Sequence, residues 1–234
     1  MSHFSDVGLS DLEDMFHYEC FMNSLLAGDF GAPTIVKTGG GKSLHIYSTG
    51  AIYFIFPVDD ATDKVVEFEL GYKNERLTLC KNVRFARKIV ETEFRTIRAE
   101  TENIPFWFDC LNAPLYDLKE EDEDGGIGCR LAVSSFVNDI KIVDEAELFS
   151  SEHSELAAES YIANEYPCNG FVSGIIKAFS LEQNPFTEEK YYVIDVDCLG
   201  VHFRLLADPE RISGKSLKVG RIARGNCWNT AFIV

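Results

Sequence analysis

The stretch Lys190-Tyr-Tyr-Val-Ile-Asp-Val-Asp-Cys-Leu-Gly-Val-His-Phe-Arg-Leu-Leu206 decides the fold of this chain. Apolar and polar side chains alternate on both sides of Gly200, and period-two alternation around a glycine predicts a β-hairpin. With Leu199 and Gly200 as its loop, the polar face pairs Asp197 with His202 and Asp195 with Arg204, and the apolar face pairs Val196 with Phe203 and Ile194 with Leu205. Opposite charges placed directly across a sheet contribute roughly 0.2–1 kcal/mol each, so this register is chemically consistent.

The segments around the hairpin extend the β pattern through Gly170–Val234. Residues 171–179 are apolar on both faces with Gly174 in the middle, which predicts a long strand bent at the glycine. Cys227–Val234 is predicted to be the last strand. Five strands in all are expected over these roughly 65 residues, and their spacing resembles the oligonucleotide/oligosaccharide-binding (OB) fold. The resemblance implies a small barrel with a binding face and leaves the ligand open.

The first part of the chain is predicted to be a helix followed by an antiparallel sheet. Ser10-Asp-Leu-Glu13 matches a capping box, and apolar residues recur at helical spacing until Gly28, so a helix is expected over about residues 10–27. Thr34–Val58 is rich in β-forming residues. The fold class is therefore α+β and mainly β, with an acidic α+β domain at 1–164 and an OB-like five-stranded β-barrel domain at 165–234.

Residues 82–100 fit two interpretations. As a helix, this segment places Arg84, Arg87, Lys88, Arg95 and Arg98 on one basic face. The alternative is a strand that starts near Leu77 and continues through Phe85. The acidic run Glu120–Asp124 could fold back on this basic segment, either as its intramolecular partner or as a displaceable mimic of an anionic partner. No convincing internal repeat is visible, although two β-rich halves leave a degenerate tandem barrel open.

Composition narrows the class of protein. The chain has 38 acidic and 22 basic residues and a formal net charge of −16, whereas residues 165–234 are neutral. A nucleic-acid partner is therefore disfavoured but not excluded, because phosphate repels an acidic protein at long range. The longest apolar stretch, Ala51–Val58, is far too short to span a membrane, so no membrane partner is expected. Seven scattered cysteines and no evident signal peptide favour the cytoplasm.

The motifs that resemble phosphate-binding, metal-binding or catalytic sequences are incomplete, so no cofactor or metal is expected. Thr38-Gly-Gly-Gly-Lys-Ser43 lacks the first glycine of a phosphate-binding loop and is followed by a β pattern instead of a helix. His17 and Cys20 form no complete metal-ligand set. Asp197 and His202 could serve as the orienting acid and the base of an enzyme with Cys227, but a cross-strand surface pair is the favoured interpretation.

The best candidate binding set combines basic and aromatic side chains of the predicted barrel. Its members are Tyr191, Arg204, Lys215, Lys218, Arg221, Arg224 and Trp228. Barrels of this type bind ligands on a strand face through aromatic stacking and basic flanks. The favoured function is a non-enzymatic cytosolic binding or adaptor protein whose partner is another protein or a small or oligomeric ligand. The alternative is an acidic inhibitor or immunity-type protein that binds a basic protein, and an enzyme centred on His202 ranks third.

Overall fold

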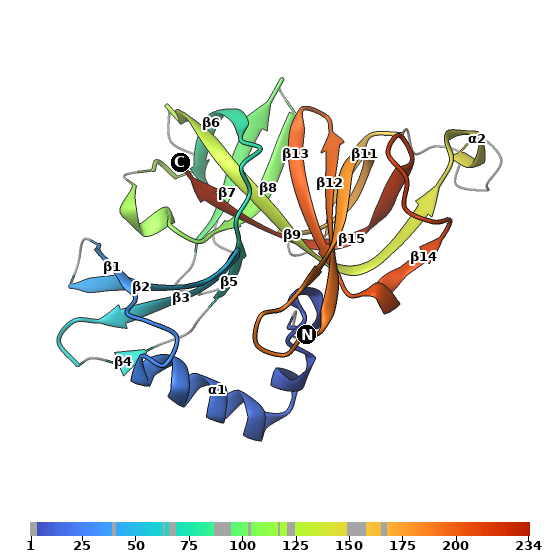
Figure 1. Cartoon of the computed structure of the whole chain (residues 1–234). Coiled ribbons are helices and arrows are strands. Elements are labelled where there is room, and N and C mark those ends of the chain that lie inside the picture. The colour runs from blue at the N-terminus through green and yellow to red at the C-terminus, as the bar shows by residue number, and fades with distance from the viewer. Residues whose placement is uncertain are drawn as a thin grey trace.

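The computed structural model describes residues 4–38, 41–62, 64–65, 69–86, 95–102, 104–116, 118–120, 125–148, 158–164 and 168–234. It is mainly β with a few short helices, as the sequence predicted (Figure 1). The described part of the chain holds no helix that is both long and apolar enough to cross a membrane.

The elements fall into helices, a smaller sheet and a larger sheet. The helices are η1 (Ser5–Val7), η2 (Ser10–Glu13), η3 (Ala113–Leu115) and η4 (Pro209–Arg211), all 3-10, and α1 (Met15–Ala27) and α2 (Glu145–Leu148). The smaller sheet holds β1 (Thr34–Lys37), β2 (Lys42–Thr49), β3 (Ile52–Asp59), β4 (Lys64–Val65) and β5 (Glu69–Tyr72). The larger sheet holds β6 (Thr78–Phe85), β7 (Arg95–Thr101), β8 (Ile104–Cys110), β9 (Ile127–Val143), β10 (Ser160–Ala163), β11 (Asn169–Gln183), β12 (Lys190–Cys198), β13 (Val201–Ala207), β14 (Ile212–Gly214) and β15 (Ile222–Ile233).

Helix α1 begins later than the sequence predicted. Asp14 is its N-cap, and the carboxylate of Asp14 accepts hydrogen bonds from the backbone N–H groups of Phe16 (3.0 Å) and His17 (3.3 Å). Ser10 donates instead to the carboxylate of Glu189, between β11 and β12. The predicted capping box at residues 10–13 is therefore wrong, because a long-range partner takes the serine that the local motif requires.

Helix α1 lies along the smaller sheet and its inner side closes a second core (Figure 1). The ring centroids of Phe21 and Phe54 are 5.1 Å apart. The same core includes Tyr191 and Leu206 of the larger sheet, so it joins the two sheets. The predicted N-terminal helix with an antiparallel sheet therefore agrees with the structure, apart from the helix start.

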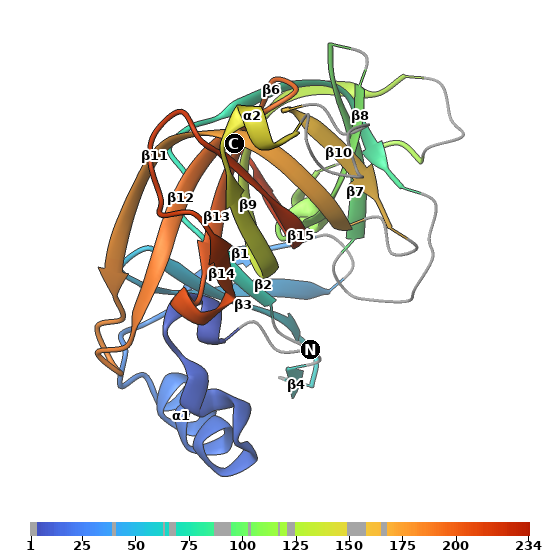
Figure 2. The same ribbon diagram turned by 90° about the vertical axis from the view of Figure 1, so that its right-hand side faces the viewer.

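The larger sheet contains two four-stranded units that share their last strands. The first unit is β6–β7–β8–β9 and the second is β11–β12–β13–β15 (Figures 1 and 2). Strand β9 pairs with β6, β15 and β13, while β15 pairs with β9, β11 and β8. Each unit thus closes a circuit of paired strands by using the last strand of the other unit.

The two units repeat each other in register. The pairs Lys81–Glu100, Arg84–Arg98 and Phe85–Ile97 of the first unit correspond to Ile175–Asp197, Ala178–Asp195 and Phe179–Ile194 of the second. Both first strands contain a register shift at the equivalent place, between residues 81 and 84 and between residues 176 and 178. Both hairpin loops begin with a non-glycine residue in the left-handed region, Glu102 at φ +47° and Leu199 at φ +51°. The repeat that the sequence left open is therefore present in the structure.

A five-stranded barrel built only from residues 165–234 is not confirmed. Strand β9, which precedes this region, pairs in parallel with β13 and antiparallel with β15, and it completes the circuit between them. The ladder of the larger sheet thus links strands on both sides of residue 165. The division into domains at 1–164 and 165–234 stays a prediction.

The predicted hairpin at residues 190–206 is confirmed in every pair. Asp197 lies opposite His202, and Asp195 lies opposite Arg204. Ile194 and Val196 are fully buried, and they belong to a main core that extends over both units. The alternation in the sequence therefore identified both the register and the inner face.

The helical interpretation of residues 82–100 is wrong for the described part of this segment. Strands β6 and β7 form an antiparallel hairpin there, in which Arg84 lies opposite Arg98. Residues 87–94, with Arg87 and Lys88, lie outside the described residues, as does the side chain of Arg95. The alternative interpretation, a strand through Phe85, is confirmed. The helical spacing of basic residues was misleading because pairing with β7 and β9 decides the local structure.

Candidate functional site

The seven residues of the predicted binding set have different surroundings. Tyr191 is 4% exposed and belongs to the second core, with its hydroxyl 3.3 Å from that of Tyr72. Burial raises the pKa of Tyr191, and the hydrogen bond with Tyr72 raises it further. Tyr191 is therefore part of the contact between the two sheets.

Lys215 and Arg221 both pair with Asp144, the residue that follows the C-terminal end of β9. The Lys215 ammonium lies 2.5 Å from the Asp144 carboxylate and 2.8 Å from that of Glu147, and the Arg221 guanidinium lies 2.8 Å from Asp144. Hydrogen bonds from Lys215 and Arg221 lower the pKa of Asp144. Lys218 is exposed in the turn before Arg221. Two of these three cations are thus already paired within the chain.

Arg224 and Trp228 lie on the same side of β15. The Arg224 guanidinium sits 5.4 Å from the ring centroid of Phe171. The Trp228 indole N–H donates to Asp109 at 2.7 Å, and its ring packs at 5.5 Å from Phe136. One face of the Trp228 ring is therefore in contact with the protein and is not available to a stacked ligand.

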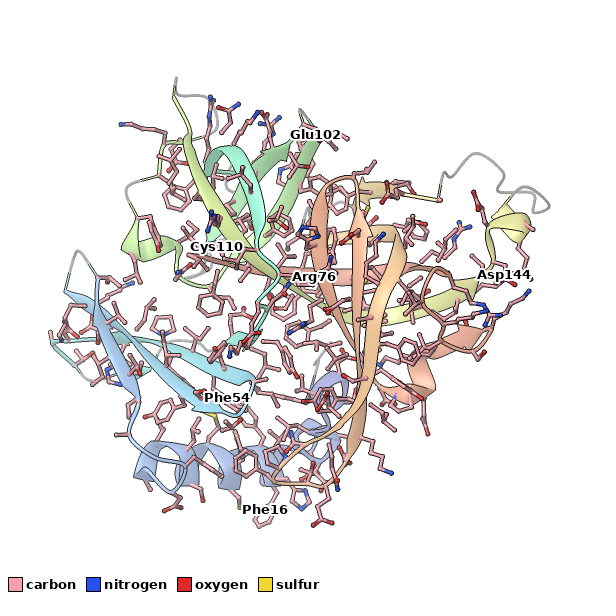
Figure 3. All side chains as sticks on the ribbon, turned by 45° about the horizontal axis from the view of Figure 1, so that its top comes forward. Phe16, Phe54, Arg76, Glu102, Cys110 and Asp144 are labelled. Carbon is pink, nitrogen blue, oxygen red and sulfur yellow. The ribbon has the colours of Figure 1, made fainter. Side chains whose placement is uncertain are left out.

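The polar face of the β12–β13 hairpin carries two ion-paired groups. Arg204 makes two hydrogen bonds to Asp195, at 2.8 and 3.0 Å. Asp197 accepts a hydrogen bond from Arg76 at 2.8 Å and lies 2.7 Å from His202 Nδ1. Arg76 comes from the segment between β5 and β6 and lies well apart from Asp144 (Figure 3). The second group connects this segment to the hairpin.

Cys227 does not complete a catalytic centre with this group. It is 1% exposed within the main core, and burial raises the pKa of its thiol. A protonated, buried thiol is a poor nucleophile, because the thiolate is the reactive form. The Asp197–His202 pair therefore fits the cross-strand structural role that the sequence favoured.

We expect Asp197 to contribute to acid sensitivity. Burial raises its pKa, but the hydrogen bond from His202 and the charge of Arg76 outweigh burial, so the pKa of Asp197 lies below its ordinary value of 3.8. A carboxyl with a lowered pKa in the folded state stabilises the fold above its unfolded pKa, and this contribution is lost as pH falls through the folded value. Urea unfolding from pH 7 to pH 2 should therefore show a shallower acid loss for Asp197→Asn than for the wild type. Equal slopes would contradict this role.

The second half of β11 is an open edge of the larger sheet. We call residues 177–183 the β11 edge; all seven are exposed, including Phe179 (41%) and Leu181 (49%). Among the described residues, the β11 edge pairs only with β12, and it forms the left-hand margin of the molecule in Figure 2. Sequence patterning predicts a strand end at Phe179, although the alternation Phe179-Ser-Leu181-Glu-Gln183 is itself a strand signal.

The backbone direction along this edge follows from one hydrogen bond. The Asn184 N–H donates to the carbonyl of Glu189 at 2.8 Å, toward the β12 side of the hairpin. Successive N–H groups of a strand point to opposite sides, so those of Ser180 and Glu182 point toward β12, while those of Phe179, Leu181 and Gln183 point outward. In the described part of the chain, the outward side of β11 is hydrogen-bonded only before the β11 edge begins, where Ile176 bonds to Gly220 and Arg221. The β11 edge therefore offers alternating donors and acceptors to another strand.

The equivalent edge of the first unit is covered by the chain itself. Phe85, the counterpart of Phe179, donates its N–H to the carbonyl of Lys119 at 2.8 Å. It also forms a parallel bridge with Glu120. Phe85 is 6% exposed, and Leu118 packs in the same core. An extended segment thus binds this edge in one unit, and the matching edge is exposed in the other.

No protein-family model, characterised protein or solved structure gives a significant match to this chain. Within the described ranges, no group of three or more His, Cys, Asp or Glu side chains is placed to hold a metal ion.

Proposed function

We propose that this protein is a non-enzymatic binding or adaptor protein that binds partner proteins by strand addition at the β11 edge. In strand addition, main-chain hydrogen bonds supply affinity and alternate side chains supply specificity. The observation that carries the proposal is the exposure of residues 177–183 on the edge of a well-paired sheet. Long exposed edges with apolar side chains attract other strands, and proteins ordinarily cover or charge them.

Two further features support this proposal. All seven cysteines are free, which is consistent with a reducing compartment such as the cytoplasm. The circuit β11–β12–β13–β9–β15 is proposed to act as an OB-like barrel whose fifth strand is β9. The ligand is a protein in this proposal because a net charge of −16 repels nucleic acid.

The proposal is tested by selecting binders from a displayed library of random twelve-residue peptides and comparing two proline variants. Leu181→Pro removes an outward N–H, and proline is tolerated on an edge strand when its missing N–H faces solvent. We expect selected peptides to bind Leu181→Pro at least about tenfold more weakly than the wild type, because a hydrogen bond and an apolar contact are lost.

The matched control is Val219→Pro. Val219 is 57% exposed and lies at the first central position of the turn Lys218–Arg221, where proline is favoured. This variant should bind like the wild type, and thermal unfolding should show that both variants fold. Peptides that bind Leu181→Pro and Val219→Pro equally well would overturn the proposed function.

A further inference from the structure

We propose, resting on the proposed function, that the β11 edge takes an extended segment parallel to β11 that has an aliphatic anchor followed five residues later by a basic residue. The arrangement is deduced from the first unit, where residues 118–120 occupy the equivalent edge. The three steps of the deduction concern direction, anchor and charge.

The direction follows from the bridge at Phe85. Phe85 and Glu120 pair in parallel, and Phe85 and Phe179 occupy equivalent places in the two units. If one partner residue lies beside Phe179 in the same manner, the partner residues two and three positions later lie beside Leu181 and Glu182. In a parallel pair, neighbouring residues share a face of the sheet, so partner residues beside Phe179 and Leu181 are expected to be apolar.

The anchor follows from Leu118. This side chain is 6% exposed and packs in the main core together with Phe85, two residues before the bridge residue Glu120. Phe85 is 6% exposed beneath this segment, whereas Phe179 is 41% exposed. Leu118 and Phe85 are buried together in the first unit. An aliphatic residue of the partner, placed where Leu118 lies relative to Phe85, would bury Phe179 in the same way. Full burial of such a side chain contributes about 1.5–3 kcal/mol.

The charge differs between the two edges. In the first unit, Arg84 lies opposite Arg98 next to Phe85, and the Arg98 guanidinium is paired with the Glu100 carboxylate at 2.5 Å. Their counterparts in the second unit are Ala178 and Asp195, so both cations are absent beside the β11 edge. Lys177 already lies 3.7 Å from the Asp197 carboxylate. The other charged residue within the β11 edge is Glu182, whose carboxylate accepts a hydrogen bond from Ser180 at 2.6 Å, and its negative charge favours a basic residue beside it in the partner.

The test uses the synthetic peptide Ser-Leu-Thr-Val-Thr-Val-Lys-Ser with a fluorescent label. One matched peptide has Glu in place of Lys, and another has Ser in place of Leu. Binding is measured by fluorescence anisotropy to the wild type, Glu182→Lys, Glu145→Lys and Leu181→Pro. Glu145 is exposed in α2, so Glu145→Lys changes the net charge equally at a place outside the β11 edge.

We expect the wild type to prefer the lysine peptide over the glutamate peptide by about fivefold, as a cross-strand charge pair allows. Loss of the leucine anchor should weaken binding about tenfold or more. The variant Glu182→Lys should prefer the glutamate peptide, whereas Glu145→Lys should still prefer the lysine peptide. The variant Leu181→Pro should bind none of the three peptides. If the wild type binds the three peptides equally and Leu181→Pro binds none of them, the deduced anchor and charge are wrong while strand addition is supported. Binding that is insensitive to Leu181→Pro overturns both.

Discussion

Gly225→Ala is expected to destabilise the protein by about 3 kcal/mol, since overpacking of this kind costs roughly 1–3 kcal/mol. Gly225 lies in β15 where β9 and β11 pair on its two sides. A Cβ atom there would lie 1.9 Å from the carbonyl oxygen of Asp139 and 2.8 Å from the Cα of Ile140. Both atoms are backbone, so no side-chain rotation can relieve the clash. The free energy of unfolding from urea titration measures the effect.

The control for this prediction is Gly128→Ala in β9. The nearest atom to a Cβ at Gly128 is the Cys80 carbonyl oxygen at 3.8 Å, an ordinary contact. We expect the free energy of unfolding to change by less than about 0.5 kcal/mol. Equal stability of the two variants would mean that β9 and β15 do not approach as closely as the shared-strand arrangement requires.

Phe203→Ala is expected to cost about 3–5 kcal/mol and to destabilise both units together. Phe203 in β13 is 1% exposed, and its ring lies 6.1 Å from that of Phe106, the corresponding residue of β8 in the first unit. A cavity at Phe203 therefore removes contacts from both units. Urea unfolding followed by far-UV circular dichroism and by tryptophan fluorescence should give one shared transition at a lower midpoint.

Two further variants sharpen this prediction. Phe179→Ala makes the same chemical change at an exposed site and should cost less than about 1 kcal/mol. The double variant Phe106→Ala/Phe203→Ala should deviate from additivity by at least about 0.5 kcal/mol, because the two rings are in contact. Separate transitions for the two units, or additive costs, would favour independent domains on either side of residue 165.

The local features of the fold were predictable where neighbouring residues decide them. The hairpin around Gly200 follows from alternation and one glycine, and its register is confirmed to the last pair. The start of α1 was missed because Ser10 and Asp14 are both good caps, and the choice depends on Glu189, far along the chain. Local sequence cannot report a partner of this kind.

The pairing of β9 and the repeat of the two units depend on distant contacts, so the sequence did not reveal them. Equivalent positions keep a phenylalanine at Phe85 and Phe179 but differ at Arg84 and Ala178, which obscures the repeat. The candidate basic set was chosen by residue type. Its members differ in surroundings because Lys215 and Arg221 pair with Asp144, while Arg204 pairs with Asp195. The β11 edge was missed because openness is a property of the whole sheet.

Amide hydrogen exchange along β11 tests strand addition most directly. In the free protein, the outward N–H groups of Phe179, Leu181 and Gln183 should exchange quickly, while those of Ser180 and Glu182, which point toward β12, should be protected. A saturating bound peptide should slow exchange at the first three and leave the other two unchanged. Protection of all five groups in the free protein, or no slowing at Phe179 and Leu181 with peptide bound, would contradict an open edge that accepts a strand.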